Sequence, residues 1–158
     1  MNLSREERAL YNPAFTGLLC TRAVQGYAQQ YGGPCPLHLA VTAGIMALQP
    51  PIRAKLPPTM KSGLMKWLDM HESVRIAMTR NAASLSAVVR PGVLFALQTS
   101  ALRTSDGGLV LAAGPTTLEI TGTTEQTIAA QRAALFLGRW LPSTGSLITV
   151  LTLLGVKP

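Results

Sequence analysis

The sequence predicts a mainly α-helical domain with a winged-helix-like unit and one short β-hairpin, which would form the wing. Apolar residues recur at helical spacing over most of the 158 residues, and proline or glycine interrupts each run. The dipeptide Asp106-Gly107 is a strong hairpin signal. Helices that lead into a short helix and then a hairpin follow the order of a winged helix, a variant of the helix-turn-helix.

Residues 1–33 are expected to form N-terminal helices in a single domain that spans 1–158. Ser4 and Glu7 make a capping-box pattern that predicts a short first helix. A long amphipathic helix should follow from Pro13, because asparagine caps a helix well and proline tolerates the first turn. Gly32-Gly33 should end that helix.

Residues 34–115 are expected to form the winged-helix-like core, and its first three helices are predicted at residues 36–48, 59–70 and 73–89. The first of these is apolar nearly all round, which is typical of a core helix. Residues 50–58 read as a proline-rich connection. The third helix should end near Arg90, because proline at 91 disfavours helical backbone in the preceding residue.

A short helix is predicted at 91–102, followed by two strands around the turn at 106–108, with Gly114-Pro115 closing the wing. Residues 116–158 should hold one C-terminal helix at 124–140 and an apolar tail at 146–154, either helix or strand. Five large side chains are expected to be substantially buried: Trp67, Phe95, Leu97, Phe136 and Trp140.

The composition favours a chain that contacts other molecules through part of its surface. Hydrophobic residues make up 47% of it and charged residues 13%, about half of the usual charged share. Either a partner covers an apolar surface, or the chain simply has a large core. The formal net charge of +7 makes nucleic acid or an acidic protein a plausible partner.

Basic residues gather in the middle of the chain, and six of them are candidates to contact DNA phosphates: Arg53, Lys55, Lys61, Lys66, Arg90 and Arg103. A solvated basic face is the alternative interpretation. The helix at 91–102 offers only Gln98 as a long polar side chain, so it is a poor reader of base edges. Any DNA binding would therefore be independent of sequence and sensitive to salt.

Titratable groups are sparse, and we expect no catalytic residue, cofactor, metal or small-molecule substrate site. His71, between Asp69 and Glu72, is better explained by helix capping or a solvated charge cluster than by metal binding. His38 lies on the apolar helix and is expected to be a core histidine. Cys20 and Cys35 lack partners at metal-ligand spacing and are expected to be reduced thiols.

The chain is expected to be cytoplasmic and to have no membrane role. The charged N-terminal residues are not followed by the apolar run of a signal peptide. The longest apolar run, at 147–156, is too short to span a bilayer.

Short segments along nearly the whole chain carry a family resemblance: Tyr11-Asn-Pro-Ala-Phe15, Arg53-Ala-Lys-Leu-Pro57, Phe95-Ala-Leu97 through Gly108-Leu109, Phe136-Leu-Gly-Arg-Trp140 and Leu153-Leu-Gly-Val-Lys-Pro158. Together they resemble the middle component of bacterial three-component ABC systems, a group that includes the C subunit of Lamassu anti-phage defence. The resemblance implies a non-enzymatic subunit encoded between an effector, often a nuclease, and an SMC-like ATPase with a coiled coil.

The leading hypothesis is therefore an accessory subunit that bridges the ATPase and the effector, and that touches non-specific DNA, if at all, through the complex. The alternative is a stand-alone winged-helix DNA-binding transcriptional regulator. Candidate partner contacts lie on the long helix from Pro13 and in the apolar tail: Tyr27, Tyr31, Leu147 and Leu151.

Overall fold

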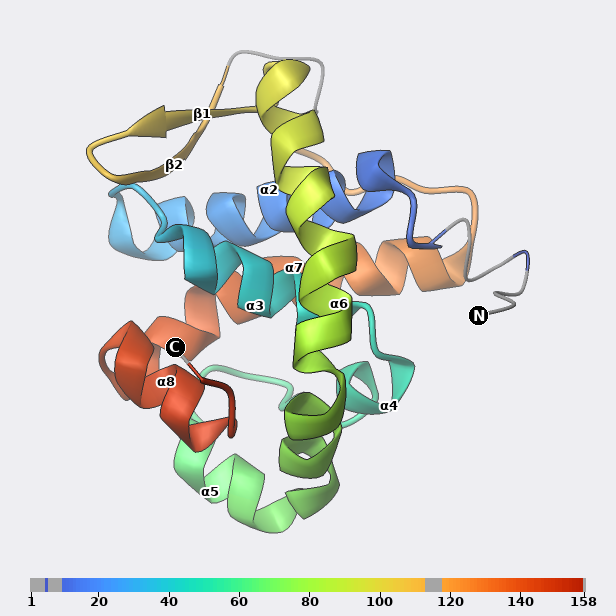
Figure 1. The fold of residues 1–158 in the computed structure, drawn as a ribbon. Coiled ribbons are helices and arrows are strands. Elements are labelled where there is room, and N and C mark those ends of the chain that lie inside the picture. The colour runs from blue at the N-terminus through green and yellow to red at the C-terminus, as the bar shows by residue number, and fades with distance from the viewer. Residues whose placement is uncertain (1–4, 6–9, 113–117, 158) are drawn as a thin grey trace.

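The computed structural model describes residues 5, 10–112 and 118–157, which form a group of packed helices with a hairpin at one edge (Figure 1). The mainly helical class is confirmed. The described helices are α2 Pro13–Tyr31, α3 Leu37–Ala47, α4 Pro50–Arg53, α5 Leu64–Met70, α6 Glu72–Gln98, α7 Glu125–Trp140, the 3-10 helix η1 Leu141–Thr144 and α8 Leu147–Leu153. The strands are β1 Leu102–Ser105 and β2 Gly108–Leu111. The capping box expected at Ser4 and Glu7 lies outside the described residues.

Side-chain caps set where three helices begin. The side-chain oxygen of Asn12 accepts a hydrogen bond from the Ala14 amide at 2.8 Å, so the predicted start of α2 is confirmed. Thr124 caps α7 in the same way. Ser146 accepts from the Thr149 amide at 3.2 Å, so the apolar tail, left open between helix and strand, is a helix.

Helix α2 lies at the centre of the fold and packs against α3, α6 and α7 (Figure 1). Two pairs of glycines allow the closest crossings. Gly17 of α2 faces Gly92 of α6, and Gly26 of α2 crosses α7 one turn from Gly138. A Cβ on any of these four glycines would meet backbone atoms of the opposite helix, so the helices pack backbone to backbone there.

Two tryptophans, one on α5 and one at the end of α7, pack together in the core. Trp140 is 0% exposed and Trp67 is 4% exposed, and their rings meet edge to face with centroids 5.2 Å apart. Each indole N–H donates to a backbone carbonyl, Trp140 to Ser62 and Trp67 to Lys55. Their predicted burial is confirmed, and this packing follows the preference of aromatic pairs for offset or edge geometry.

The remaining burial predictions had mixed outcomes. Phe136 and Leu97 are half-buried against the core. The burial of Phe95 was wrong, because this side chain is 39% exposed. Successive positions of a helix are rotated by about 100° around its axis. Because Ala96 faces the core, the preceding residue, Phe95, points outward.

The helix break predicted at Arg90 was also wrong, because α6 runs through Pro91 and is 27 residues long in total. Of the separate helix expected at 91–102, residues 91–98 are the last part of α6, whereas residues 99–101 form a turn and Leu102 begins β1. Proline costs a helix one hydrogen bond, but Val89 and Val93 are buried on either side and Gly92 packs against α2. Burial of this face therefore outweighs the local cost. Two smaller corrections concern α5, which begins at Leu64, and α4, which lies inside the expected connection.

The hairpin forms where it was predicted. Leu102 pairs with Leu111 and Ser105 with Gly108 in an antiparallel register. Asp106 and Gly107 have φ values of 48° and 78°, as a tight two-residue hairpin turn requires. Cys35 and Leu109 exchange two backbone hydrogen bonds, of 2.9 and 2.8 Å, so β2 is held against the link between α2 and α3. The expected wing closure at Gly114-Pro115 lies outside the described residues.

Candidate interaction surfaces

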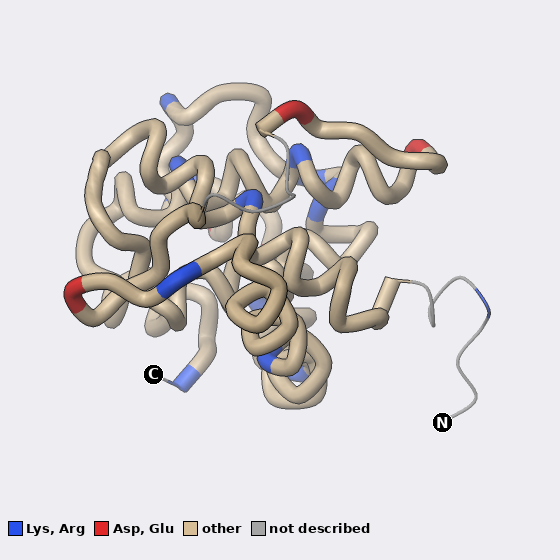
Figure 2. Tube along the Cα trace, turned by 90° about the horizontal axis from the view of Figure 1, so that it is seen from above, with Lys and Arg blue, Asp and Glu red and all other residues tan. Residues whose placement is uncertain are grey.

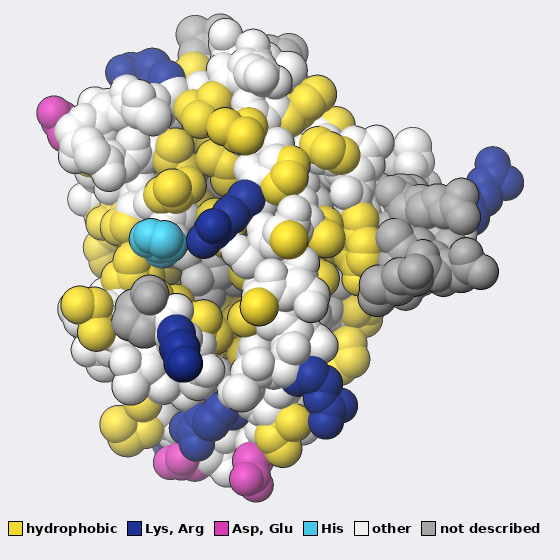
Figure 3. Space-filling model, in the orientation of Figure 1, with side chains coloured by type: hydrophobic (Ala, Val, Ile, Leu, Met, Phe, Trp, Pro, Cys, Tyr) yellow, Lys and Arg dark blue, Asp and Glu magenta, His cyan; other side chains and the backbone are white. Residues whose placement is uncertain are grey.

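A groove runs between α3 and α6 and is closed at one end by the hairpin. Its upper hollow has a volume of about 610 Å³. Apolar side chains dominate its lining: Leu37, Val41, Val93, Leu94, Leu97 and Leu109. Val93 and Leu109 form a buried floor, whereas Leu94 and Leu37 are 62% and 44% exposed. Figure 3 shows hydrophobic side chains gathered on this face below the hairpin. Exposed leucines over an apolar floor are typical of a surface that a partner covers.

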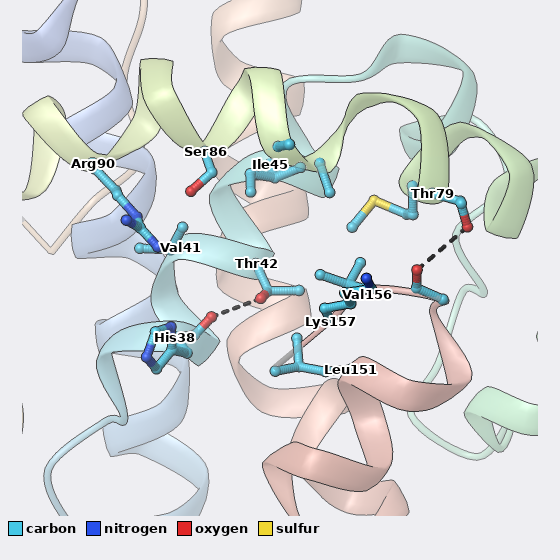
Figure 4. A pocket seen from close by; sticks show the side chains of 14 residues that line it. His38, Val41, Thr42, Ile45, Thr79, Ser86, Arg90, Leu151, Val156 and Lys157 are labelled. Atoms are coloured by element: carbon cyan, nitrogen blue, oxygen red, sulfur yellow. Dashed lines mark hydrogen bonds between the residues drawn. The ribbon is translucent and has the colours of Figure 1, made fainter.

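The groove continues into a lower hollow of about 460 Å³, which lies between α3, α6 and the C-terminal residues. His38, Val41 and Arg90 line both hollows, so the two hollows adjoin at these three residues. Hydrogen bonds from Arg75 to Leu153 and from Thr79 to Gly155 hold the C-terminal residues against α6. The C-terminal residues therefore form the lower wall of the groove (Figure 4).

Positive charge lies at the waist and at the lower end of this groove. Arg90 is exposed and extends from α6 past Val41 toward α3, and Lys157 lines the lower hollow (Figure 4). Among the described residues that line either hollow, none is acidic. The groove thus combines an apolar bed with a basic rim, which suits an acidic, apolar partner.

His38 was expected in the core, but it is exposed at this rim. Its helix α3 is apolar on nearly every side, a pattern that predicts burial of the whole helix. The structure buries every residue of α3 from Leu39 to Ala47 and leaves only the first two, Leu37 and His38, exposed at the groove. No local signal in the sequence brings His38 and Arg90 together, because α3 and α6 meet only in the folded chain.

A further hollow, outside the groove and about 440 Å³ in volume, is lined by three of the six predicted phosphate contacts. Lys55, Lys61 and Lys66 line it, and we call it the lysine hollow. Lys61 and Lys66 are exposed. The floor is fixed because Trp67 packs in the core and its indole N–H donates to the Lys55 carbonyl at 2.7 Å. The ammonium group of Lys55 donates to the Ser73 hydroxyl, so Lys61 and Lys66 are the exposed lysines here that can attract a phosphate backbone.

The other three predicted phosphate contacts lie elsewhere. Arg53 turns inward and donates to the Ala47 carbonyl at 2.6 Å, and desolvation lowers the pKa of its guanidinium. Arg90 lies in the groove, and Arg103 lies on β1 of the hairpin, at the opposite end of the molecule from α5 (Figure 1). Figure 2 likewise shows Lys and Arg spread over the molecule. The six residues do not form one continuous patch.

The four predicted partner contacts differ in how exposed their side chains are. Tyr31 is 41% exposed and its hydroxyl donates to the Arg139 carbonyl at 2.6 Å, while half-buried Tyr27 lies against it with ring centroids 4.9 Å apart. Burial raises the pKa of the Tyr31 hydroxyl. The neighbouring Tyr27 raises this pKa further, and the positive charge of Arg139 lowers it. Leu147 is half-buried, and Leu151 is only 4% exposed, so its side chain already packs within the chain.

Reactive groups are held in unreactive settings. Cys20 and Cys35 are both 0% exposed, and burial raises the pKa of each thiol to about 12. At neutral pH both remain protonated and cannot act as thiolate nucleophiles. Half-buried His71 lies against Trp67, with ring centroids 5.5 Å apart. Within the described part of the chain, no three His, Cys, Asp or Glu side chains lie close enough to hold a metal ion.

Among the described helices, we find none with the length and apolar character needed to cross a membrane. The family model for the ABC-three component (ABC-3C) system Middle Component 3 matches residues 1–158. Neither a curated protein nor a solved structure gives a significant match.

Proposed function

The chain belongs to the ABC-three component (ABC-3C) system Middle Component 3 family, and on this premise we propose that it is a non-catalytic bridging subunit. It would hold an SMC-like coiled-coil ATPase and an effector, often a nuclease, in one complex that acts against phages or plasmids, as in Lamassu-type systems. The single observation that supports this role best is the apolar, basic-rimmed groove between α3 and α6.

A bridging subunit needs two separate contact surfaces. The groove supplies one, and the tyrosine pair at the end of α2 supplies the second in this proposal. Tyr31 offers an aromatic ring at the surface, and aromatic residues are enriched in protein interfaces. The non-catalytic part of the proposal is supported by the buried thiols and by the scarcity of grouped titratable side chains in the described residues.

Bridging predicts that the effector recovers the ATPase only when this chain is present. We would co-express the three components, purify through a tag on the effector, and measure the ATPase that co-purifies. We expect Tyr31→Glu to reduce the recovery and Gln29→Glu, which is exposed on the same helix, to leave it unchanged. Equal recovery without this chain, or sequence-specific binding of DNA by the chain alone, would contradict the proposal.

Contact with DNA inside the complex is a second candidate role, and the lysine hollow is the observation that favours it. The regulator hypothesis gains less support, because the end of α6 presents Leu94 and Phe95 to solvent where a reading helix needs polar side chains. Phosphate contacts by lysines would give binding that does not depend on base sequence.

We therefore expect the double variant Lys61→Glu with Lys66→Glu to weaken binding of two unrelated duplexes equally. Two lost phosphate contacts should flatten the slope of log affinity against log salt by about 2. Fluorescence anisotropy of the assembled complex over a salt series measures both quantities. The matched control is Arg80→Glu with Arg132→Glu, two exposed arginines outside the hollow. An unchanged slope in the lysine variant would make these residues ordinary solvated charges.

A further inference from the structure

We propose that the groove between α3 and α6 binds an amphipathic α-helix of the ATPase, with an apolar stripe flanked by acidic side chains. This inference rests on the proposed function, because it names the contact that one of the two partners makes. The occupant is identified by the shape of the groove, the chemistry of its bed and the sign of the charge at its rim.

The shape favours a helix. Two helices, α3 and α6, form the walls, and the groove continues from the hairpin to the C-terminal residues. A third helix laid along two packed helices can insert a row of side chains between theirs, as in ordinary helix packing. Amphipathic helices bind such grooves through anchors at positions i, i+3, i+4 and i+7.

The chemistry of the lining favours a peptide over a small-molecule ligand. Small-molecule sites enclose most of the ligand and direct a few polar groups at it. Here the bed is apolar, and the charged groups stand at the waist and the lower end. Leu94 lies 62% exposed on one wall and Leu37 lies 44% exposed on the other, so an apolar stripe between them would remove both from water.

The charge at the rim decides which helices fit. Arg90 lines both hollows and Lys157 lines the lower one, with no acidic side chain among the described lining residues. Asp106 is next in sequence to the lining residue Gly107, and it is exposed in the hairpin turn. A helix with a basic flank would meet like charge, and a helix with Asp or Glu at that flank would pair with Arg90.

The buried cysteines make a site-specific test possible. Both native thiols are 0% exposed, so a maleimide crosslinker should react in the folded chain only with a cysteine introduced by Leu94→Cys. In the assembled complex, we expect this position to crosslink to one ATPase segment whose apolar residues recur at helical spacing beside Asp or Glu. Crosslinking to a second copy of this chain, to the effector, or to a segment without acidic residues would overturn the inference.

Affinity measurements with charge exchange complete the test. We expect Leu94→Asp to weaken binding of the purified ATPase about 30-fold or more, as for an interface anchor. Arg90→Glu should weaken it about tenfold, and replacing the facing acidic residue of the ATPase with lysine should restore it. Ile76→Asp and Arg132→Glu are the matched controls, because both residues are exposed on helices and neither lines the groove.

Two results separate this inference from the proposed function. If the wild-type chain fails to bind the ATPase, the proposed function is wrong. If the wild-type chain binds and the two groove variants bind equally well, bridging stands and the groove is not the contact. Circular dichroism and thermal unfolding of each variant show that the exposed substitutions leave the fold intact.

Discussion

Replacing Gly138 with alanine is expected to lower the free energy of unfolding by about 2 kcal/mol, although alanine normally stabilises a helix interior by about 1 kcal/mol over glycine. A Cβ at Gly138 would collide with the Ala23 carbonyl of α2, and this carbonyl belongs to a helix that cannot yield locally. The two helices must move apart, which loosens the apolar contacts along both. Leucine at Gly138 should cost more than alanine. Urea unfolding followed by circular dichroism measures the change.

The control for this prediction is Gly33→Ala. Among the described residues other than its two chain neighbours, no atom lies within 4 Å of a Cβ built on Gly33, and its φ is not positive, so we expect a change within about 0.5 kcal/mol. Gly26→Ala acts at the same crossing of α2 and α7, so its combination with Gly138→Ala should cost less than the sum of the two. A stabilised Gly138→Ala protein would show that the crossing is looser than the structure has it.

Local signals in the sequence predicted the elements that local chemistry controls. Asn12 before Pro13 gave the start of α2, and Asp106-Gly107 gave the hairpin turn. In both cases the deciding interaction lies within a few residues, so periodicity and turn chemistry were sufficient. The hairpin follows directly after the end of α6, where the Asp106-Gly107 turn predicted it.

The predictions failed where a distant segment decides the outcome. Pro91 was expected to end a helix, but the close packing of its neighbour Gly92 against Gly17, 75 positions earlier, keeps α6 continuous. Phe95 was expected inside because it is large and apolar, whereas the rotation of α6 is fixed by Ala96 and Val89. Sequence periodicity reports that a helix has an apolar face, but not which partner covers that face.

The candidate surfaces show the same division. Charge clustering found the three residues of the lysine hollow, because they lie within one short stretch of chain. It also counted Arg53, whose guanidinium instead binds a carbonyl inside the chain. The groove was missed, because its walls come from α3 and α6, its end from the hairpin and its lower wall from the C-terminus. Surfaces built from distant segments require the fold itself.

Replacing Arg22 with methionine is the second change with a large expected effect. Arg22, Gln25 and Gln131 are 2%, 4% and 1% exposed and form one buried polar network. Arg22 donates to the side-chain oxygens of Gln131 and Gln25 at 3.1 and 2.9 Å, and to the Glu119 carbonyl at 3.1 Å. Desolvation lowers the pKa of this guanidinium. The network attaches the link before α7 to the centre of α2.

Methionine fills much of the space of Arg22 but donates no hydrogen bond, so two buried glutamine oxygens lose their guanidinium donors. We expect the free energy of unfolding to fall by about 3 kcal/mol. Hydrogen exchange should rise at Gln131 and its neighbours in α7, and Arg132→Met, exposed on that helix, should change neither quantity. The triple variant Arg22→Met, Gln25→Leu and Gln131→Leu should be more stable than Arg22→Met alone. It leaves no glutamine oxygen unpaired. In the wild-type chain the side-chain amides of Gln25 and Gln131 donate to the carbonyls of Leu118 and Thr121 at 2.9 and 2.8 Å. These carbonyls and that of Glu119 belong to exposed residues, so they can turn to water once their donors are removed. A triple variant less stable than the single one would show that the network contributes more than the satisfaction of its own buried groups.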